Sequence, residues 1–257
     1  MVSGRLNDVL PEWEGFAHAV RARRPDSGTW CEAWTVRDIL VHQTGNGAEL
    51  HRVLAAHIDG NPVETRNFEV REAPYRAMSD TVLWAAFVEQ CERLTDIAAA
   101  AEADLAEDTT IGWTGRKVTP AFFAEHLRSE LILHRWDLTG DDTSATNSLM
   151  QRWMTEHSVH EVGKPLLVRG AAGLDLGPSG RFEGRLRAPG AEDILVTATE
   201  SGSDIAFVPV EGDATIESDP AVRALLLWGR RPSDHSRWHS DAGPDELRRL
   251  RTLLSGY

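Results

Sequence analysis

Apolar residues recur at helical spacing from the start of the chain to about residue 160. The apolar stripes cover residues 10–20, 36–54, 79–103 and 119–138. Because an α-helix turns once every 3.6 residues, each stretch would present one apolar face to a shared core. Thr35, followed three residues later by Asp38, predicts the N-terminal cap of the second helix, and Thr119-Pro120 predicts the start of the fourth. Four such helices predict a four-helix bundle.

The pattern changes after a further helical stretch at residues 145–162. Gly, Pro, Asp and Ser then separate short β-like runs at residues 166–168, 181–186, 194–199, 205–210 and 215–217. Two helices are expected to follow, at residues 219–228 and 244–254. The prediction is therefore a two-domain chain, with a helical bundle at residues 1–162 and a small α+β domain with an antiparallel sheet at residues 163–257.

Composition narrows the class of partner. The 257 residues carry a formal net charge of −13, which disfavours binding to nucleic acid or to an anionic membrane surface. No apolar run approaches the roughly 20 residues of a membrane-spanning helix, and the N-terminus has no apolar leader region. The two cysteines, Cys31 and Cys91, form no disulfide framework. We expect a soluble cytoplasmic protein.

Three residues of the predicted bundle are candidate metal ligands. Glu130 and His134 lie four residues apart on the fourth helix, so they share a face with Cβ atoms about 6 Å apart. His42 lies on the second helix. Zinc and its neighbours in the periodic table accept a mixed set of nitrogen and oxygen ligands, and a catalytic site keeps one position open.

Each candidate also has a structural explanation. His42, between apolar neighbours, could be a hydrogen-bonded core residue. Glu130 could form a salt bridge to Arg128, Arg135 or an arginine of a neighbouring helix, because a buried carboxylate is costly unless it is paired. His126 extends the stripe of Glu130 and His134 by one turn, and it could be a ligand, a hydrogen-bond donor behind the ligands or a surface histidine.

The other polar residues are less informative. Asp137 lies three residues after His134, so it could orient the histidine ring or act at the helix end. Two further histidine pairs, at residues 157 and 160 and at residues 235 and 239, have no recognised ligand spacing and are expected on the surface. The sequence lacks nucleotide-binding glycine motifs, the His-Glu-x-x-His motif and the Gly-x-Ser-x-Gly motif.

Two motifs resemble those of a known family. The segment WTVRDILVH at residues 34–42 and the segment ELILHRWDL at residues 130–138 resemble the two metal motifs of the mycothiol-dependent maleylpyruvate isomerase family, which belongs to the DinB-like metal-binding bundles. Residues 113–119 are similar to that family's approach to its second motif. Residues 210–214 and 225–230 resemble its second domain, which is similar to sterol-carrier folds.

The resemblance implies a site and its cofactors. It implies that His42, Glu130 and His134 hold a metal ion, typically Zn²⁺, and that mycothiol is the thiol cofactor. In the isomerase an arginine of the C-terminal domain reaches the active site, and Arg230 is the best match here. A helix-end cation exposed to solvent is the alternative interpretation of Arg230.

Several functions remain open. A metal-bound thiolate could isomerise an unsaturated carboxylate from cis to trans, or transfer sulfur to a small electrophile. Metal-bound water would instead make a thiol-independent hydrolase. The chain could also be a non-catalytic protein that binds a metal or a small ligand. The expected partners are a small electrophile or unsaturated carboxylate and a low-molecular-weight thiol, and the chain could be a monomer or a homodimer.

Overall fold

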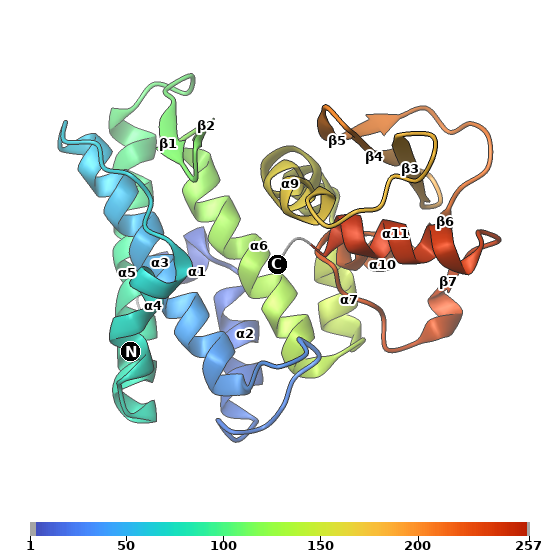
Figure 1. The fold of residues 1–257 in the computed structure, drawn as a ribbon. Coiled ribbons are helices and arrows are strands. Elements are labelled where there is room, and N and C mark those ends of the chain that lie inside the picture. Colours follow the sequence, from blue (N-terminus) through green and yellow to red (C-terminus); the bar gives the residue numbers. More distant parts are fainter. Residues whose placement is uncertain (1–3, 256–257) are drawn as a thin grey trace. The chain divides into compact units, whose positions relative to one another are not determined.

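The computed structural model describes residues 4–255, except for the side chain of Val162. Residues 1–3 lie outside the described part. They belong to the N-terminal stretch in which no apolar leader region was expected. The chain divides into two compact units, Met1–Thr139 and Gly140–Tyr257 (Figure 1). The change of character at residue 163 falls inside the second unit, because the helices that precede it pack with α10 (Pro220–Leu227).

The first unit is the predicted helical bundle. Its long helices are those expected from the sequence, and α3, α5 and α6 pack side by side (Figure 1). A short additional helix, α4, was not predicted. The elements are α1 (Gly4–Val9), α2 (Trp13–Arg21), α3 (Val36–Ile58), α4 (Phe68–Arg76), α5 (Asp80–Asp104), β1 (Ile111–Trp113), β2 (Arg116–Val118) and α6 (Ala121–Thr139).

The core of the bundle is aromatic and aliphatic. Trp13 and Phe16 of α2 pack on Phe87 of α5, with ring centroids 6.4 and 5.5 Å apart, respectively. Leu50 of α3 and Phe123 of α6 are fully buried in the same core. Burying side chains of this size contributes about 1.5–3 kcal/mol each, so packing rather than helix propensity holds α3 and α6 in place.

The predicted cap of α3 is present. The Thr35 hydroxyl accepts a hydrogen bond from the Asp38 backbone N–H, and the Asp38 carboxylate accepts one from the Thr35 N–H. This capping box satisfies backbone donors that the first turn of a helix leaves free. It fixes the start of α3 at Val36, less than two turns before His42.

The loop between α3 and α4 is anchored by a buried carboxylate. Glu49, on α3, accepts hydrogen bonds from the Arg52 side chain and from both the backbone and the side chain of Arg66. Its side chain has no exposed surface. Burial alone would raise the pKa of Glu49, but the hydrogen bonds from the two arginines outweigh burial and lower it. Glu49 therefore determines where the chain enters α4.

The second unit joins helices to a five-stranded sheet. Its strand order is β5-β4-β3-β6-β7, and α9 packs on β5 while α11 packs on β3 and α9. The elements are α7 (Thr143–Leu149), α8 (Arg152–His157), the π-helix η1 (Ser158–Gly163), α9 (Lys164–Ala171), β3 (Arg181–Arg187), β4 (Asp193–Thr199), β5 (Gly202–Val208), β6 (Ile216–Ser218), α10 (Pro220–Leu227), the 3₁₀ helix η2 (His235–Arg237), β7 (Trp238–His239) and α11 (Pro244–Leu254).

The expected antiparallel pairing is present between β3 and β4, β4 and β5, and β6 and β7, whereas β6 runs parallel to β3. One expectation for this unit was wrong. Residues 166–168 are not a strand but part of α9, which begins at Lys164-Pro165 and buries Leu167 while leaving Val168 exposed. A short apolar run does not distinguish a buried strand from one face of a helix, and a proline at the start favours the helix.

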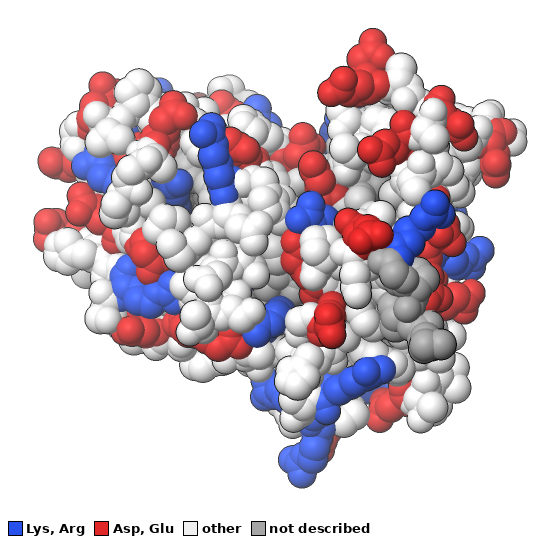
Figure 2. Space-filling view, turned by 180° about the vertical axis from the view of Figure 1, so that it is seen from behind, with Lys and Arg blue, Asp and Glu red and all other residues white. Residues whose placement is uncertain are grey.

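The prediction that two pairs of histidines lie on the surface is confirmed in part. His160, His235 and His239 are exposed, but His157 is 5% exposed, because α8 turns it into the unit. On the face drawn in Figure 2, Lys and Arg side chains are interspersed with Asp and Glu, in keeping with the net charge of −13. No helix in the described part of the chain is both long and apolar enough to cross a membrane.

Replacing Thr114 tests the turn of the β1–β2 hairpin. Thr114 and Gly115 have φ values of 45° and 79°, so both central positions of this two-residue turn are left-handed. Asn is favoured at the first of these positions and β-branched Thr is disfavoured. We expect Thr114→Asn to raise the free energy of unfolding by about 1 kcal/mol, measured by urea denaturation. An unchanged or lower value would contradict this assignment of the turn.

Replacing Glu49 tests the anchor of the loop. We expect Glu49→Gln to lower the free energy of unfolding by about 2 kcal/mol at neutral pH, because charged hydrogen bonds to two arginines are lost. The lowered pKa means that the carboxylate stabilises the fold above its usual pKa of 4.5, and that this contribution disappears as the pH falls through the lowered value. The difference between wild type and variant should therefore shrink on acidification. A difference that grows towards low pH would refute the assignment.

Candidate metal centre

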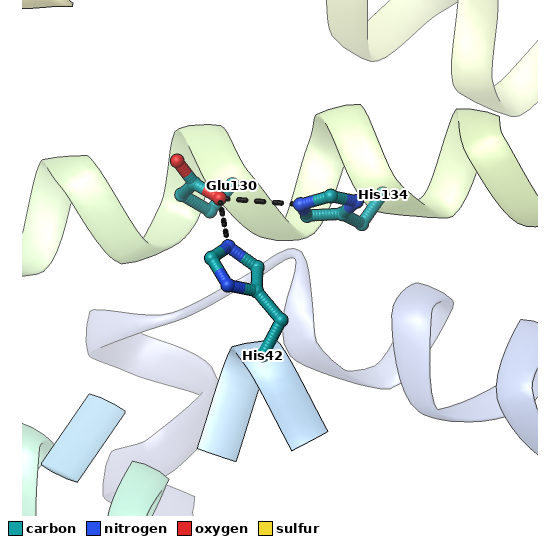
Figure 3. A group of neighbouring side chains, drawn as sticks. All are labelled: His42, Glu130 and His134. Atoms are coloured by element: carbon teal, nitrogen blue, oxygen red, sulfur yellow. Dashed lines mark hydrogen bonds and ion pairs between the residues drawn. The ribbon is translucent and has the colours of Figure 1, made fainter. Parts of the chain in front are cut away.

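Helix α6 places two of the predicted ligands on one face. Glu130 and His134 are 7% and 2% exposed, and one helical turn separates them. The Nε2 atom of His134 lies 3.3 Å from Oε2 of Glu130. Figure 3 shows both side chains directed to the same side of α6. The predicted four-residue spacing thus produces a contact between the two groups.

Helix α3 brings the third predicted ligand to the same point. His42 is 4% exposed, and its Nε2 atom lies 3.2 Å from the same Oε2 atom of Glu130 (Figure 3). One potential ligand atom from each of His42, Glu130 and His134 lies within 4.8 Å of the others. The structure therefore brings together the three residues that the sequence singled out.

The second nitrogen of each ring is held by a carboxylate. Nδ1 of His134 is 2.8 Å from Asp137, and Nδ1 of His42 is 2.9 Å from Glu72. Both carboxylate side chains are almost fully buried. An ionised carboxylate can only accept, so each Nδ1–H donates and the lone pair of a neutral ring is on Nε2. The expected orienting role of Asp137 is thus present in the geometry.

This arrangement suits a positively charged occupant. Two Nε2 lone pairs face a carboxylate oxygen, and acceptors this close need a proton or a metal ion between them. When protons rather than a metal ion lie on the two Nε2 atoms, these nitrogens donate to Glu130. Burial alone would then raise the pKa of Glu130, but the hydrogen bonds from His134 and His42 hold it well below the usual range. Burial would lower the pKa of His134, but Asp137 and Glu130 raise it. The donor set fits a dication of the zinc type.

The salt-bridge explanation of Glu130 was wrong. In the described residues the partners of its carboxylate are His42, His134, His126 and the Gln43 amide, and none is an arginine. Arg128 forms a bidentate pair with Glu12, the residue that precedes α2. Glu130 is therefore paired with groups that can also bind a metal.

His126 faces the other oxygen of the same carboxylate. Its Nε2 atom is 3.8 Å from Oε1 of Glu130, and its side chain is 12% exposed. Burial lowers its pKa to about 4, so the ring is neutral at neutral pH. It stacks on Phe122 with centroids 5.0 Å apart. His126 therefore lies beside the candidate centre, outside the group of three converging ligand atoms.

Sequence reasoning missed Glu72. It lies on α4, and Arg76 one turn later donates to its other oxygen at 2.5 Å. In the sequence, Glu72 and Arg76 look like an ordinary exposed ion pair on a helix. Burial follows from the approach of α4 to α3 at Gly45, where an added Cβ atom would lie 3.0 Å from Cγ of Glu72. Gly45, a glycine inside a helix, was the signal in the sequence that could have indicated this close approach of α4.

Aromatic rings enclose the histidines. Trp34 lies against His42 and His134, with centroids 5.1 and 5.7 Å away. Phe68 stacks on the His42 ring at 4.9 Å, and the guanidinium of Arg71 lies 4.5 Å from the Phe68 ring. These rings exclude water from the imidazoles, which strengthens electrostatic interactions around them.

Arg230 belongs to the second unit. It is 8% exposed and follows Gly229 at the end of α10. One of its guanidinium nitrogens donates to the backbone carbonyl of Trp228 at 2.8 Å. It is therefore not the fully solvated cation of the alternative interpretation, and its role at the site stays a prediction.

Comparison with known proteins identifies the family. The sequence profile of the mycothiol maleylpyruvate isomerase N-terminal domain matches residues 6–139, more than half of the chain. The chain belongs to the mycothiol maleylpyruvate isomerase family. The matched residues contain His42, Glu130 and His134, and end where the first compact unit ends.

Two solved structures share the fold over both units of this family member. The crystal structure of the mycothiol-dependent maleylpyruvate isomerase superposes with a TM-score of 0.60 at 16% identity, covering 91% of each chain. A histidine-to-alanine mutant of that enzyme gives a TM-score of 0.59 at 15% identity, covering 95% of each chain. The expected two-domain fold class is confirmed. No curated protein sequence matches the chain.

Two glycines of α3 allow a matched test of the helix approach. At Gly45 a Cβ atom would also lie 3.2 Å from the backbone oxygen of Arg71, whereas at Gly47 the nearest atom, Cβ of Gln90, is 3.6 Å away. We expect Gly45→Ala to destabilise the protein by about 1–3 kcal/mol through overpacking. Gly47→Ala should stabilise it by roughly 0.5–1 kcal/mol through helix propensity. Urea unfolding measures both, and equal effects of the two changes would argue against this packing.

Proposed function

We propose that the chain is a metal-dependent enzyme that uses mycothiol to isomerise a small unsaturated carboxylate from cis to trans. His42, Glu130 and His134 would hold the metal ion, and Glu72 and Asp137 would orient the two histidines. The convergence of both Nε2 atoms on one oxygen of Glu130 carries the proposal. Family membership supports the choice of thiol and of reaction class.

Zinc is the metal that suits the site best. Two neutral imidazoles and one carboxylate form the ligand set of many catalytic zinc sites, which keep a further position for water or substrate. Buried carboxylates behind both rings increase the basicity of the ligands. The buried carboxylates of Glu72, Glu130 and Asp137 carry three negative charges, and Arg76 balances the one on Glu72. With neutral histidines, a dication would balance the other two.

The chemistry requires an activated sulfur. A bound dication would favour the thiolate form of an incoming thiol, and thiolate is the nucleophilic form. Its addition to a cis double bond leaves a single bond that can rotate, and its elimination restores the double bond as trans with the thiol unchanged. The enclosing rings of Trp34 and Phe68 would keep water from competing.

Other residues would bind the substrate carboxylate. We assign this role to Arg230, whose guanidinium can hold a carboxylate through two parallel hydrogen bonds. Arg71, a buried cation stacked on Phe68, is a second group of the right charge. Both cysteines are free thiols, which suits the reducing cytoplasm where a low-molecular-weight thiol is kept reduced.

Loss of one imidazole tests the metal site. The purified protein should contain stoichiometric zinc, and turnover of maleylpyruvate should require added mycothiol. We expect His42→Ala to weaken zinc binding by more than about 100-fold, since even loss of an orienting partner costs 10–100-fold. His57→Ala, in the last turn of the same helix, should leave metal content and turnover unchanged. Metal analysis after dialysis against a chelator measures the effect.

The same experiment separates the alternatives. Zinc content that His42→Ala leaves unchanged would falsify the ligand assignment. Turnover that persists in thiol-free buffer would indicate a hydrolase. Zinc binding without turnover of any electrophile in the presence of mycothiol would indicate a binding protein. If the wild-type protein does not turn over maleylpyruvate but transfers the thiol to another electrophile, it is an S-transferase.

A further inference from the structure

Asn46 is a buried amide without a partner in the protein. It lies on α3 one turn after His42 and is 1% exposed. In the described residues neither its Nδ2 nor its Oδ1 atom has a hydrogen-bond partner. Leaving a buried polar group unpaired costs about 1–3 kcal/mol, and native proteins contain few such groups. A bound molecule that pairs with the amide would account for its presence.

The direction of the side chain follows from the helix. Each residue of an α-helix is rotated by about 100° from the one before. Asn46 therefore projects about 40° from His42, between His42 and Gln43. Both of these neighbours reach Oε2 of Glu130, at 3.2 and 3.4 Å. The Asn46 amide is directed towards α6, next to the proposed metal ligands.

Gln43 strengthens this observation. Its Nε2 atom donates to Glu130, which fixes the amide, while its Oε1 atom is buried without a partner. Two amide groups on the same side of α3 thus keep hydrogen-bonding capacity beside the ligands. The Asn46 amide offers two N–H donors and one carbonyl acceptor side by side. The complementary molecule presents an acceptor oxygen next to a hydroxyl donor.

We propose that Asn46 binds the enolisable carbonyl group of the electrophilic substrate. This inference rests on the proposed function, and it adds Asn46 as the residue that contacts the carbonyl group of the unsaturated substrate. In the keto form Nδ2 donates to the carbonyl oxygen, and in the enol form, where a proton has moved from carbon to that oxygen, Oδ1 accepts from the hydroxyl. Asn46 thereby selects substrates by a group other than the carboxylate.

The contact would also assist the reaction. When sulfur forms a bond to the carbon of a double bond conjugated with the carbonyl, the π electrons move to the carbonyl oxygen. When the carbon–sulfur bond breaks again, they return to the double bond. No atom is gained or lost overall. A hydrogen bond from Nδ2 to this oxygen stabilises the charge while it is there, as in an oxyanion hole.

The test compares Asn46→Leu with wild type. Acetylpyruvate is the probe, because it has the carboxylate and the enolisable carbonyl but no double bond for sulfur to attack. Titration of the zinc-loaded protein should show probe binding about tenfold weaker in the variant, the effect of losing one or two hydrogen bonds. The melting temperature should be unchanged or higher, because no hydrogen bond within the protein is lost. Zinc content should be unchanged.

Two further variants keep the test decisive. Asn46→Ala cannot overpack the site and should weaken probe binding as much as Asn46→Leu does. Thr44→Val removes a buried hydroxyl on the opposite side of α3, where Thr44 bonds to the Leu40 carbonyl, and should leave the affinity for acetylpyruvate unchanged. With maleylpyruvate, kcat should fall by about 10²–10³ in the Asn46 variants alone.

The possible failures can be distinguished. Equal affinity for acetylpyruvate in wild type and both Asn46 variants, including no binding by any of them, overturns the role of Asn46. A lower melting temperature with unchanged probe binding also overturns it and assigns a structural role. Absence of mycothiol-dependent turnover in the wild type, with probe binding that still depends on Asn46, refutes the proposed reaction and leaves the carbonyl-binding role in place.

Discussion

The pairing of a buried carboxylate with each imidazole is the interaction on which the candidate centre depends. Glu72 and Asp137 fix the ring orientation and the tautomer of His42 and His134, so that both Nε2 atoms face Glu130. Without them the rings could rotate, and the convergence on one oxygen would be lost. The helix cap at Thr35, the glycine at residue 45 and the anchor at Glu49 serve the same geometry, since they set the positions of α3 and α4.

Contacts within one helix were predictable from the sequence. Glu130, His134 and Asp137 are related by helical period alone, and the period is visible in the apolar pattern of α6. The partnership of Glu72 with His42 joins residues 30 positions apart and depends on how closely two helices approach. Apart from the glycine at residue 45, no local pattern indicates that approach. The strand expected at residues 166–168 was wrong for a related reason, because the packing partner decides between strand and helix.

The buried polar residues of α3 are of two kinds, those that stabilise the fold and one that is proposed to bind a ligand. His42, Thr44 and Glu49 each have partners within the protein, so their burial contributes to the stability of one conformation. Asn46 has no such partner in the described residues and reduces stability unless a ligand is present. Such a residue makes the ligand-free protein less stable, but it strengthens the binding of the ligand. The same helix thus contains both structural and ligand-directed polar residues.

The location of three of the site residues on two successive turns of α6 has a consequence for how metal and fold are coupled. Any opening of the bundle that moves α3 away leaves Glu130, His134 and Asp137 together, because the helix alone sets their spacing. An ion would keep two protein ligands during such an opening and regain His42 on closure. For the proposed metal site, capture would therefore begin on a half-formed site, and the last ligand to arrive would draw α3 and α4 into register.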